Sequence, residues 1–173
     1  YGSEAGEALA LHMDVDAIGF TGSTRVGRSM LEYASRSNLK RVYNELGGKS
    51  ANIVFADYAD LERAAETAAG AMFFNQGESC NAPSRLFVQA DIADEFVARL
   101  TALTPRYMPA DPLDEGTVMG ALVDATQLNT VKGYIEHGHQ EGAVCLTGGR
   151  QAFADSGGFY VEPTVFDRVS NSM

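Results

Sequence analysis

The chain has 173 residues, of which 45% are hydrophobic and 21% charged, a composition that gives a globular protein enough apolar material for a real core. Its formal net charge is −10, which repels nucleic acid phosphates and anionic membrane surfaces, so both are discounted as partners. No stretch approaches the roughly 18 consecutive apolar residues that a membrane-spanning helix needs.

Short apolar runs alternate along the chain with segments of helical periodicity. This alternation predicts an α/β fold in which helices are layered around a mostly parallel sheet. Strands are expected over residues 17–20, 40–44, 51–55, 85–88, 143–146 and 159–166. Helices are expected from about residue 24, after Asp57 or Asp60, after Asp91 and over 124–142, with a proline-containing loop over 105–116.

Two of the expected helices have a clear apolar face. The helix after Asp60 carries apolar residues at the spacing of one helical face: Leu61, Ala64, Ala65, Ala68 and Met72. The helix after Asp91 does the same: Ile92, Phe96, Leu100 and Leu103. We interpret both faces as core contacts.

Residues Phe20 to Gly27 combine a strand, a turn of small residues and the start of a helix. Small residues allow a phosphate to approach free backbone N–H groups at a helix N-terminus. The plainer alternative makes Ser23 or Thr24 an ordinary N-cap and Gly22 an ordinary turn residue. The spacing also differs from the Gly-x-Gly-x-x-Gly dinucleotide fingerprint, so this segment alone favours the plainer alternative.

Glu45 stands just before Gly47 and Gly48, which suggests a carboxylate at a loop where the backbone bends sharply. A glutamate in such a place is a candidate general base. The alternative is a solvated surface residue with Lys49 as a neighbour.

Cys80 follows the polar stretch Asn75 to Ser79 at the end of an expected helix. A cysteine in a polar loop is a better candidate nucleophile than one in a strand, although an inert thiol remains the alternative. Cys145 lies between Val144 and Leu146 and is interpreted as core filler. Two cysteines are too few for a disulfide framework, so a cytoplasmic location is expected.

The pair His137 and His139 has no cysteine at ligand spacing, so no metal site is expected. Both ends of the chain have the character of cut ends: it begins at Tyr1 without an initiating Met, and it stops just after an apolar extended segment. We therefore interpret the sequence as an internal piece of a longer protein.

Taken together and in this order, three motifs closely resemble the aldehyde dehydrogenase superfamily. They are Phe-Thr-Gly-Ser-Thr at 20–24, Glu-Leu-Gly-Gly-Lys at 45–49 and Asn-Gln-Gly-x-x-Cys at 75–80. The resemblance extends to residues 12–16, 111–122 and 157–165, and so covers essentially the whole chain. Within the family, the sequence loosely resembles the γ-glutamyl-γ-aminobutyraldehyde and betaine-aldehyde dehydrogenase branches.

The resemblance implies that residues 1–46 end an NAD(P)-binding domain and that residues 47–173 begin a catalytic domain. It implies oxidation of an aldehyde to a carboxylic acid with NAD or NADP. Cys80 would attack the aldehyde to form a thiohemiacetal and then a thioester, and Glu45 would act as general base for hydrolysis.

The remaining roles are also implied by the resemblance. Residues expected to bind the cofactor are Gly22, Ser23, Thr24, Gly27, Leu46 and Gln127. Many family members have a Lys at the position of Thr130, which weakens the assignment of Gln127 to the ribose. The residues that flank the nucleophile, Glu78, Ser79 and Asn81, are expected to line the aldehyde pocket. They are polar and favour a polar aldehyde.

The family's side-chain oxyanion donor and part of its cofactor site have no counterpart in this chain, so the isolated chain is expected to be inactive. The full-length enzyme is expected to be a homo-oligomer, either a dimer or a tetramer. One alternative is a non-catalytic fragment that serves as a packing module. Another is a CoA-acylating semialdehyde dehydrogenase, in which coenzyme A and not water releases the thioester. Glu45 favours water.

Overall fold

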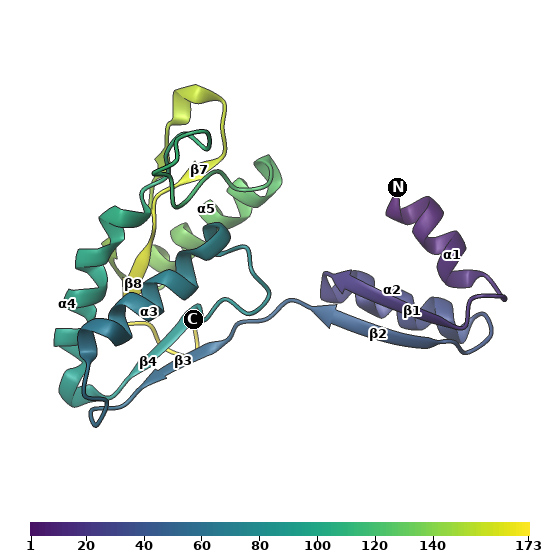
Figure 1. Ribbon diagram of the computed structural model, residues 1–173, viewed down its shortest axis with the longest axis horizontal. Coiled ribbons are helices and arrows are strands. Elements are labelled where there is room, and N and C mark those ends of the chain that lie inside the picture. Colours follow the sequence, from purple (N-terminus) through teal and green to yellow (C-terminus); the bar gives the residue numbers. More distant parts are fainter. The chain divides into compact units, whose positions relative to one another are not determined.

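The computed structural model describes residues 1–173 as two compact units, Tyr1–Gly48 and Lys49–Met173 (Figure 1). Helices make up 44% of the chain, and the mixture of helices and strands confirms the expected α/β class. The division lies two residues after the domain boundary expected at Leu46. The identification of the two parts as a cofactor domain and a catalytic domain stays a prediction. No helix has the length and apolar character needed to cross a membrane.

The first unit is a parallel β-α-β arrangement preceded by a short helical segment. A π-helical turn, Gly2–Gly6, runs into α1 (Glu7–Leu11). Strand β1 (Ala17–Gly22), helix α2 (Thr24–Ser35) and strand β2 (Arg41–Leu46) follow. The two strands pair in parallel, and α2 packs on them through its buried residues Gly27, Met30 and Ala34. Both strands run further than the sequence predicted.

Lys40 is a buried charged residue in this unit, with 6% of its surface exposed. Its ammonium group donates hydrogen bonds to the carbonyls of Ala10 and His12, at 2.7 and 3.0 Å, and to Ser37 Oγ at 2.9 Å. Asn38 donates to two further carbonyls of the same stretch. The connection between α2 and β2 therefore holds the end of α1 and the lead-in to β1 in place.

The second unit begins with the parallel pair of β3 (Ala51–Val54) and β4 (Arg85–Val88). Helix α3 (Leu61–Phe73) connects them, and Asp60 caps it by accepting from the amide of Arg63 at 3.0 Å. Helix α4 (Ala93–Leu103) follows β4. Three 3-10 turns flank these helices: Phe74–Gly77, Ala90–Ile92 and Thr104–Tyr107.

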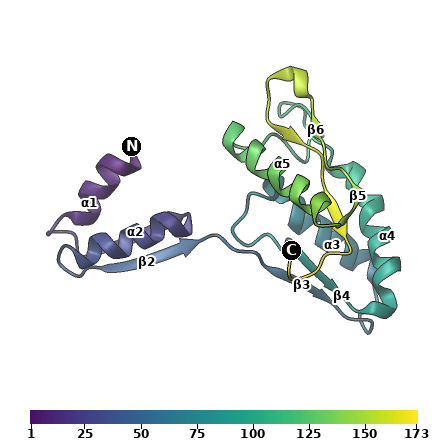
Figure 2. The ribbon, with the colours of Figure 1, turned by 180° about the vertical axis from the view of Figure 1, so that it is seen from behind.

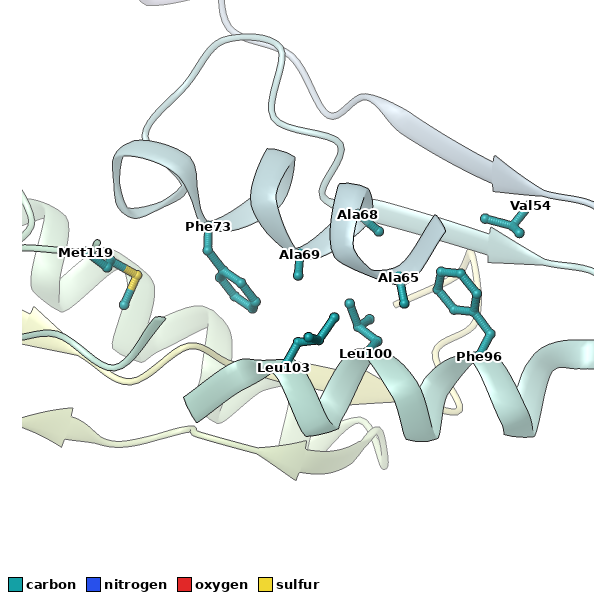
Figure 3. Close-up of a cluster of buried hydrophobic side chains, with 9 residues drawn as sticks. All are labelled: Val54, Ala65, Ala68, Ala69, Phe73, Phe96, Leu100, Leu103 and Met119. Atoms are coloured by element: carbon teal, nitrogen blue, oxygen red, sulfur yellow. The ribbon is translucent and has the colours of Figure 1, made fainter. Parts of the chain in front are cut away.

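The main hydrophobic core lies between α3 and α4 (Figure 3). On α4 the residues that point toward α3 are Phe96, Leu100 and Leu103, as predicted. On α3 the buried residues are Ala65, Ala68, Ala69 and Phe73. The predicted inner face of α3 is therefore turned about the helix axis relative to the observed one. The prediction missed Ala69 and Phe73, and three residues that it placed inside are only partly buried: Leu61, Ala64 and Met72. Alanine side chains lie on more than one side of α3. The spacing of apolar residues in the sequence therefore does not single out the face that is buried.

Two other expectations are wrong. Asp91 does not cap α4, because it lies within the 3-10 turn Ala90–Ile92 and its carboxylate accepts from Gln89 Nε2 at 3.4 Å. The N-cap position of α4 is Ile92, without a side-chain cap. The loop expected over 105–116 also begins later, because Pro105 lies in a 3-10 turn.

The chain ends with α5 (Ala125–Gln140) and four short strands, β5 (Val144–Thr147), β6 (Gln151–Ala152), β7 (Tyr160–Val161) and β8 (Val165–Asp167). β5 pairs with β8 and β6 with β7, both antiparallel, and α5 packs against β5 (Figure 2). The single strand expected over 159–166 is thus divided in two. Pro163 lies in the break, and proline lacks the N–H group that continuous strand pairing needs.

Candidate active site

The carboxyl ends of β1 and β2 bring several predicted residues together in the first unit. In the parallel register Thr21 lies opposite Glu45, and Gly22 lies opposite Leu46. Helix α2 begins directly after this end of the pair, with Ser23 at its N-cap position. Ligands of open parallel sheets bind outside the carboxyl ends of the strands. This end of the first unit is therefore its candidate binding edge.

Ser23 is the N-cap of α2, as the plainer interpretation of this segment had it. Its Oγ accepts a hydrogen bond from the amide of Val26 at 3.3 Å, and its carbonyl accepts the first helical bond, from Gly27, at 2.9 Å. As the first two helical residues, Thr24 and Arg25 have N–H groups without intrahelical acceptors. Such groups, together with the positive end of the helix dipole, favour an anion at this position.

Gly27 lies where α2 packs on β2. A Cβ atom built on Gly27 would lie 2.7 Å from Leu46 Cδ2 and 3.4 Å from Asn44 Cγ. Asn44 also donates from Nδ2 to the Gly27 carbonyl at 3.2 Å. The structure therefore gives Gly27 a packing role that seats the start of α2 on the strand. Its contact with a cofactor stays a prediction.

Glu45 is the penultimate residue of β2, and its side chain is exposed. The sequence placed it at a sharp bend, which is wrong: Glu45 is in extended strand conformation, and Gly47 does not have a positive φ. The strand instead fixes the direction of Glu45, because successive side chains point to opposite faces of a sheet.

In the second unit, Cys80 lies in a turn that follows α3. The turn begins with three residues in left-handed conformation, Asn75, Gln76 and Gly77, at φ values of 49°, 58° and 76°. The Cys80 thiol is free and exposed. Ser79 Oγ donates to Asn81 Oδ1 at 2.8 Å, so the two residues that flank Cys80 are linked to each other. The expectation of a cysteine in a polar loop at a helix end is confirmed.

Two side chains of the same turn contact the segment before α5. Gln76 Oε1 accepts a hydrogen bond from the amide of Gly120 at 3.3 Å, and Glu78 Oε1 accepts one from the amide of Val123 at 3.4 Å. The sequence pointed to Glu78 as a pocket residue and missed Gln76. The only available signal was the position of Gln76 inside the Asn-Gln-Gly stretch that precedes the cysteine.

Gln127 lies in the first turn of α5, half-buried, and its amide donates to the capping residue Asp124 at 2.8 Å. Cys145 lies on β5, half-buried, with its Sγ 3.3 Å from the Thr147 carbonyl. His137 and His139 occupy the last turn of α5, against the rings of Tyr134 and Phe166 respectively. The structure contains no group of three or more potential metal ligands.

The predicted residues thus fall into two local groups. Gly22, Ser23, Thr24, Glu45 and Leu46 gather at one edge of the first unit. Glu78, Ser79, Cys80 and Asn81 share one turn of the second unit, and Gln127 lies on α5 of that unit.

The sequence model of the aldehyde dehydrogenase family matches residues 1–173. The chain belongs to this family. The NADP/NAD-dependent aldehyde dehydrogenase PuuC of Escherichia coli K12 is 46% identical over 166 residues, which cover 96% of the chain and 33% of that protein. The crystal structure of γ-glutamyl-γ-aminobutyraldehyde dehydrogenase from Burkholderia cenocepacia J2315 is 56% identical, with a TM-score of 0.91 over 95% of the chain and 33% of its own.

An indole-3-acetaldehyde dehydrogenase solved in complex with NAD+ is 53% identical, with a TM-score of 0.97 over 100% of the chain and 35% of its own. The chain therefore spans about a third of the length of the relatives that it matches.

Proposed function

We propose that the protein containing this chain oxidises an aldehyde to a carboxylic acid with NAD or NADP, with Cys80 as nucleophile and Glu45 as general base. The observation that carries the proposal is the exposed free thiol of Cys80 on a turn at the end of α3, in a chain that belongs to the aldehyde dehydrogenase family over its whole length. The relative solved with NAD+ supports the choice of cofactor.

The proposed chemistry begins with the Cys80 thiolate. Its Sγ attacks the carbonyl carbon of the aldehyde, a C–S bond forms, and the carbonyl electron pair moves to oxygen, giving the thiohemiacetal anion. The backbone N–H of Cys80 is the proposed donor to that oxygen. When bound, the oxidised nicotinamide supplies the hydride-accepting chemistry that converts the thiohemiacetal to a thioester.

Hydrolysis of the thioester needs a base. Glu45 takes a proton from water, the water oxygen bonds to the acyl carbon, and the C–S bond breaks to return the Cys80 thiolate and release the acid. The strand position of Glu45 supports this role, because a side chain on β2 has a fixed direction, unlike one on a free loop.

The first unit fits the pyrophosphate of a nicotinamide cofactor. The Thr24 and Arg25 amides lack helical acceptors, Ser23 contributes a hydroxyl, and Gly22 presents no side chain at the end of β1. We propose that these residues hold the phosphates, that Leu46 lies near the nicotinamide, and that Gln127 contacts the ribose.

The proposed substrate is a polar aldehyde of the amino- or amido-aldehyde class. Glu78, Ser79 and Asn81 are polar, and the relative from Burkholderia cenocepacia is named for γ-glutamyl-γ-aminobutyraldehyde. A panel of aldehydes tested on the full-length protein addresses this directly. A higher kcat/KM for amino- or amido-aldehydes supports the proposal, and a preference for long-chain alkanals contradicts it.

A CoA-acylating semialdehyde dehydrogenase is the second candidate, and Glu45 is the observation that favours water over a thiol. Product analysis of the full-length protein, with coenzyme A present, separates the two. We expect free acid, and a predominance of acyl-CoA would refute the hydrolytic assignment. We further propose a cytoplasmic homo-oligomer, a dimer or tetramer, without nucleic acid or membrane partners; both cysteines are free thiols and the net charge is −10.

The isolated 173-residue chain is proposed to be inactive, since it corresponds to about a third of its relatives' length. A non-catalytic packing module is the alternative for the chain as it stands. Reduction of NAD+ by the purified chain with an aldehyde would overturn the proposed inactivity.

A further inference from the structure

The turn that carries Cys80 is fastened to a distant part of the chain through two side-chain oxygens. Gln76 Oε1 accepts from the amide of Gly120, 44 residues later, and Glu78 Oε1 accepts from the amide of Val123, 45 residues later. In both pairs the partner is a backbone N–H group, so each side chain contributes an acceptor oxygen. Neither contact requires a negative charge.

This turn has a conformation that needs external support. Asn75 and Gln76 have φ values of 49° and 58°. The left-handed region costs a residue such as glutamine on the order of 1–2 kcal/mol, whereas asparagine tolerates it better. Inside the turn, the Glu78 amide donates to the Asn75 carbonyl at 2.9 Å, and Asn75 Nδ2 donates to the Glu78 carbonyl at 3.2 Å. Glu78 is therefore held by its backbone on one side and by its carboxylate on the other.

The segment that receives these contacts is itself fixed. Met119 and Leu122 are buried, with 4% and 7% of their surface exposed, and the Leu122 amide donates to the Phe159 carbonyl at 2.9 Å. A turn that is tied to an anchored segment keeps its geometry, whereas a strained turn without such ties relaxes. Cys80 lies two residues after Glu78, so its position depends on these ties.

We propose that Gln76 and Glu78 are positioning residues for Cys80, and that they act through their acceptor oxygens and not through charge. The inference rests on the proposed function, because it assumes that Cys80 is the nucleophile. Glu78 then has two proposed roles, lining the aldehyde pocket and positioning Cys80. For Gln76, positioning Cys80 is the one proposed role.

Two substitutions of Glu78 by side chains of similar length distinguish the role of its acceptor oxygen from the role of its charge. Glu78→Gln keeps a carbonyl oxygen and loses the charge, whereas Glu78→Met loses both. In the full-length protein we expect the kcat of Glu78→Gln to exceed that of Glu78→Met about five-fold, because both variants remove the charge and only Gln keeps the acceptor oxygen. Glu78→Met should lower kcat about ten-fold with a smaller change in KM, which is the loss expected when one hydrogen bond of about 1.4 kcal/mol no longer orients the nucleophile.

Glu115→Met is the matched control, because Glu115 is an exposed glutamate in the loop that precedes this segment. It should leave kcat unchanged. Gln76→Glu and Gln76→Met make the same comparison at the hydrogen bond between Gln76 and the Gly120 amide. This second pair tests the proposal if Glu78→Met does not fold. A Glu78→Gln protein as impaired as Glu78→Met would overturn the proposal, as would Met variants at both positions that match the Glu115→Met protein.

Cys80→Ser keeps the two kinds of failure apart. If Cys80→Ser abolishes turnover and the Met variants remain fully active, the positioning inference is wrong and the proposed function stands. If Cys80→Ser retains turnover, the proposed nucleophile is wrong, and the positioning inference fails with it.

Discussion

Gly27 of α2 packs directly against Leu46 of β2, since a Cβ atom on Gly27 would lie 2.7 Å from Leu46 Cδ2. The absence of a side chain at this position lets the helix start rest on the end of the strand. The same contact therefore sets both the position of the helix N-terminus and the position of Leu46, the two features proposed to meet the cofactor.

Gly27→Ala is expected to destabilise the protein by about 1–2 kcal/mol, because overpacking costs more than the helix propensity of alanine returns. It should also weaken NAD+ binding by the full-length protein. Urea unfolding and a cofactor titration measure the two effects. Gly19→Ala is the control, since Gly19 lies inside β1 and a Cβ atom there would meet nothing within 4 Å, so this substitution should not destabilise the protein. Equal stability of the two variants would contradict the packing role.

Lys40→Met tests the buried ammonium group of the first unit. The substitution leaves the carbonyls of Ala10 and His12 and the hydroxyl of Ser37 without their donor, and it should cost about 2–3 kcal/mol of stability. Lys132→Met is the matched control, because Lys132 is exposed and its ammonium group donates to the side chain of Gln151, at 3.2 Å. Thermal unfolding compares the pair, and similar melting temperatures would show that Lys40 is dispensable.

Gly133→Ala should stabilise the protein by about 0.5–1 kcal/mol. Gly133 lies inside α5, where glycine is less favourable than alanine, and a Cβ atom there would meet nothing within 4 Å. At Gly138 in the same helix, a Cβ atom would lie 3.2 Å from the ring of Phe166, so Gly138→Ala should lose part or all of that gain. Calorimetric melting of the two variants tests the difference, and a larger gain at Gly138 would contradict the packing around Phe166.

The sequence was sufficient for several elements whose structure depends on local chemistry. Strand β4 is Arg85–Val88, as predicted, since a short β-prone run bounded by polar residues has few alternatives. Asp60, one of the two residues predicted to cap α3, does so, because a carboxylate can pair with the first amides of a helix. The inward face of α4 also follows from the spacing of its large apolar residues.

The sequence was insufficient where tertiary contacts decide. Only packing against α4 selects Ala69 and Phe73 as the inner face of α3. In the turn that contains the left-handed Asn75 and Gln76, the side chains of Gln76 and Glu78 accept hydrogen bonds from residues more than 40 positions away, and no local pattern contains such contacts. In the candidate site, residue types and family motifs pointed to Cys80 and Glu45, while the supporting role of Gln76 became visible only in the structure.

The most direct test of the central claim is the capture of the acyl group on Cys80. In the full-length protein, Glu45→Gln should slow hydrolysis, so a reaction quenched during turnover with aldehyde and NAD+ should accumulate thioester. Peptide mass spectrometry is expected to find the substrate-derived acyl mass on the Cys80 peptide and none on the Cys145 peptide. Acylation of another residue, or normal release of acid with no acyl group on Cys80, would contradict the account.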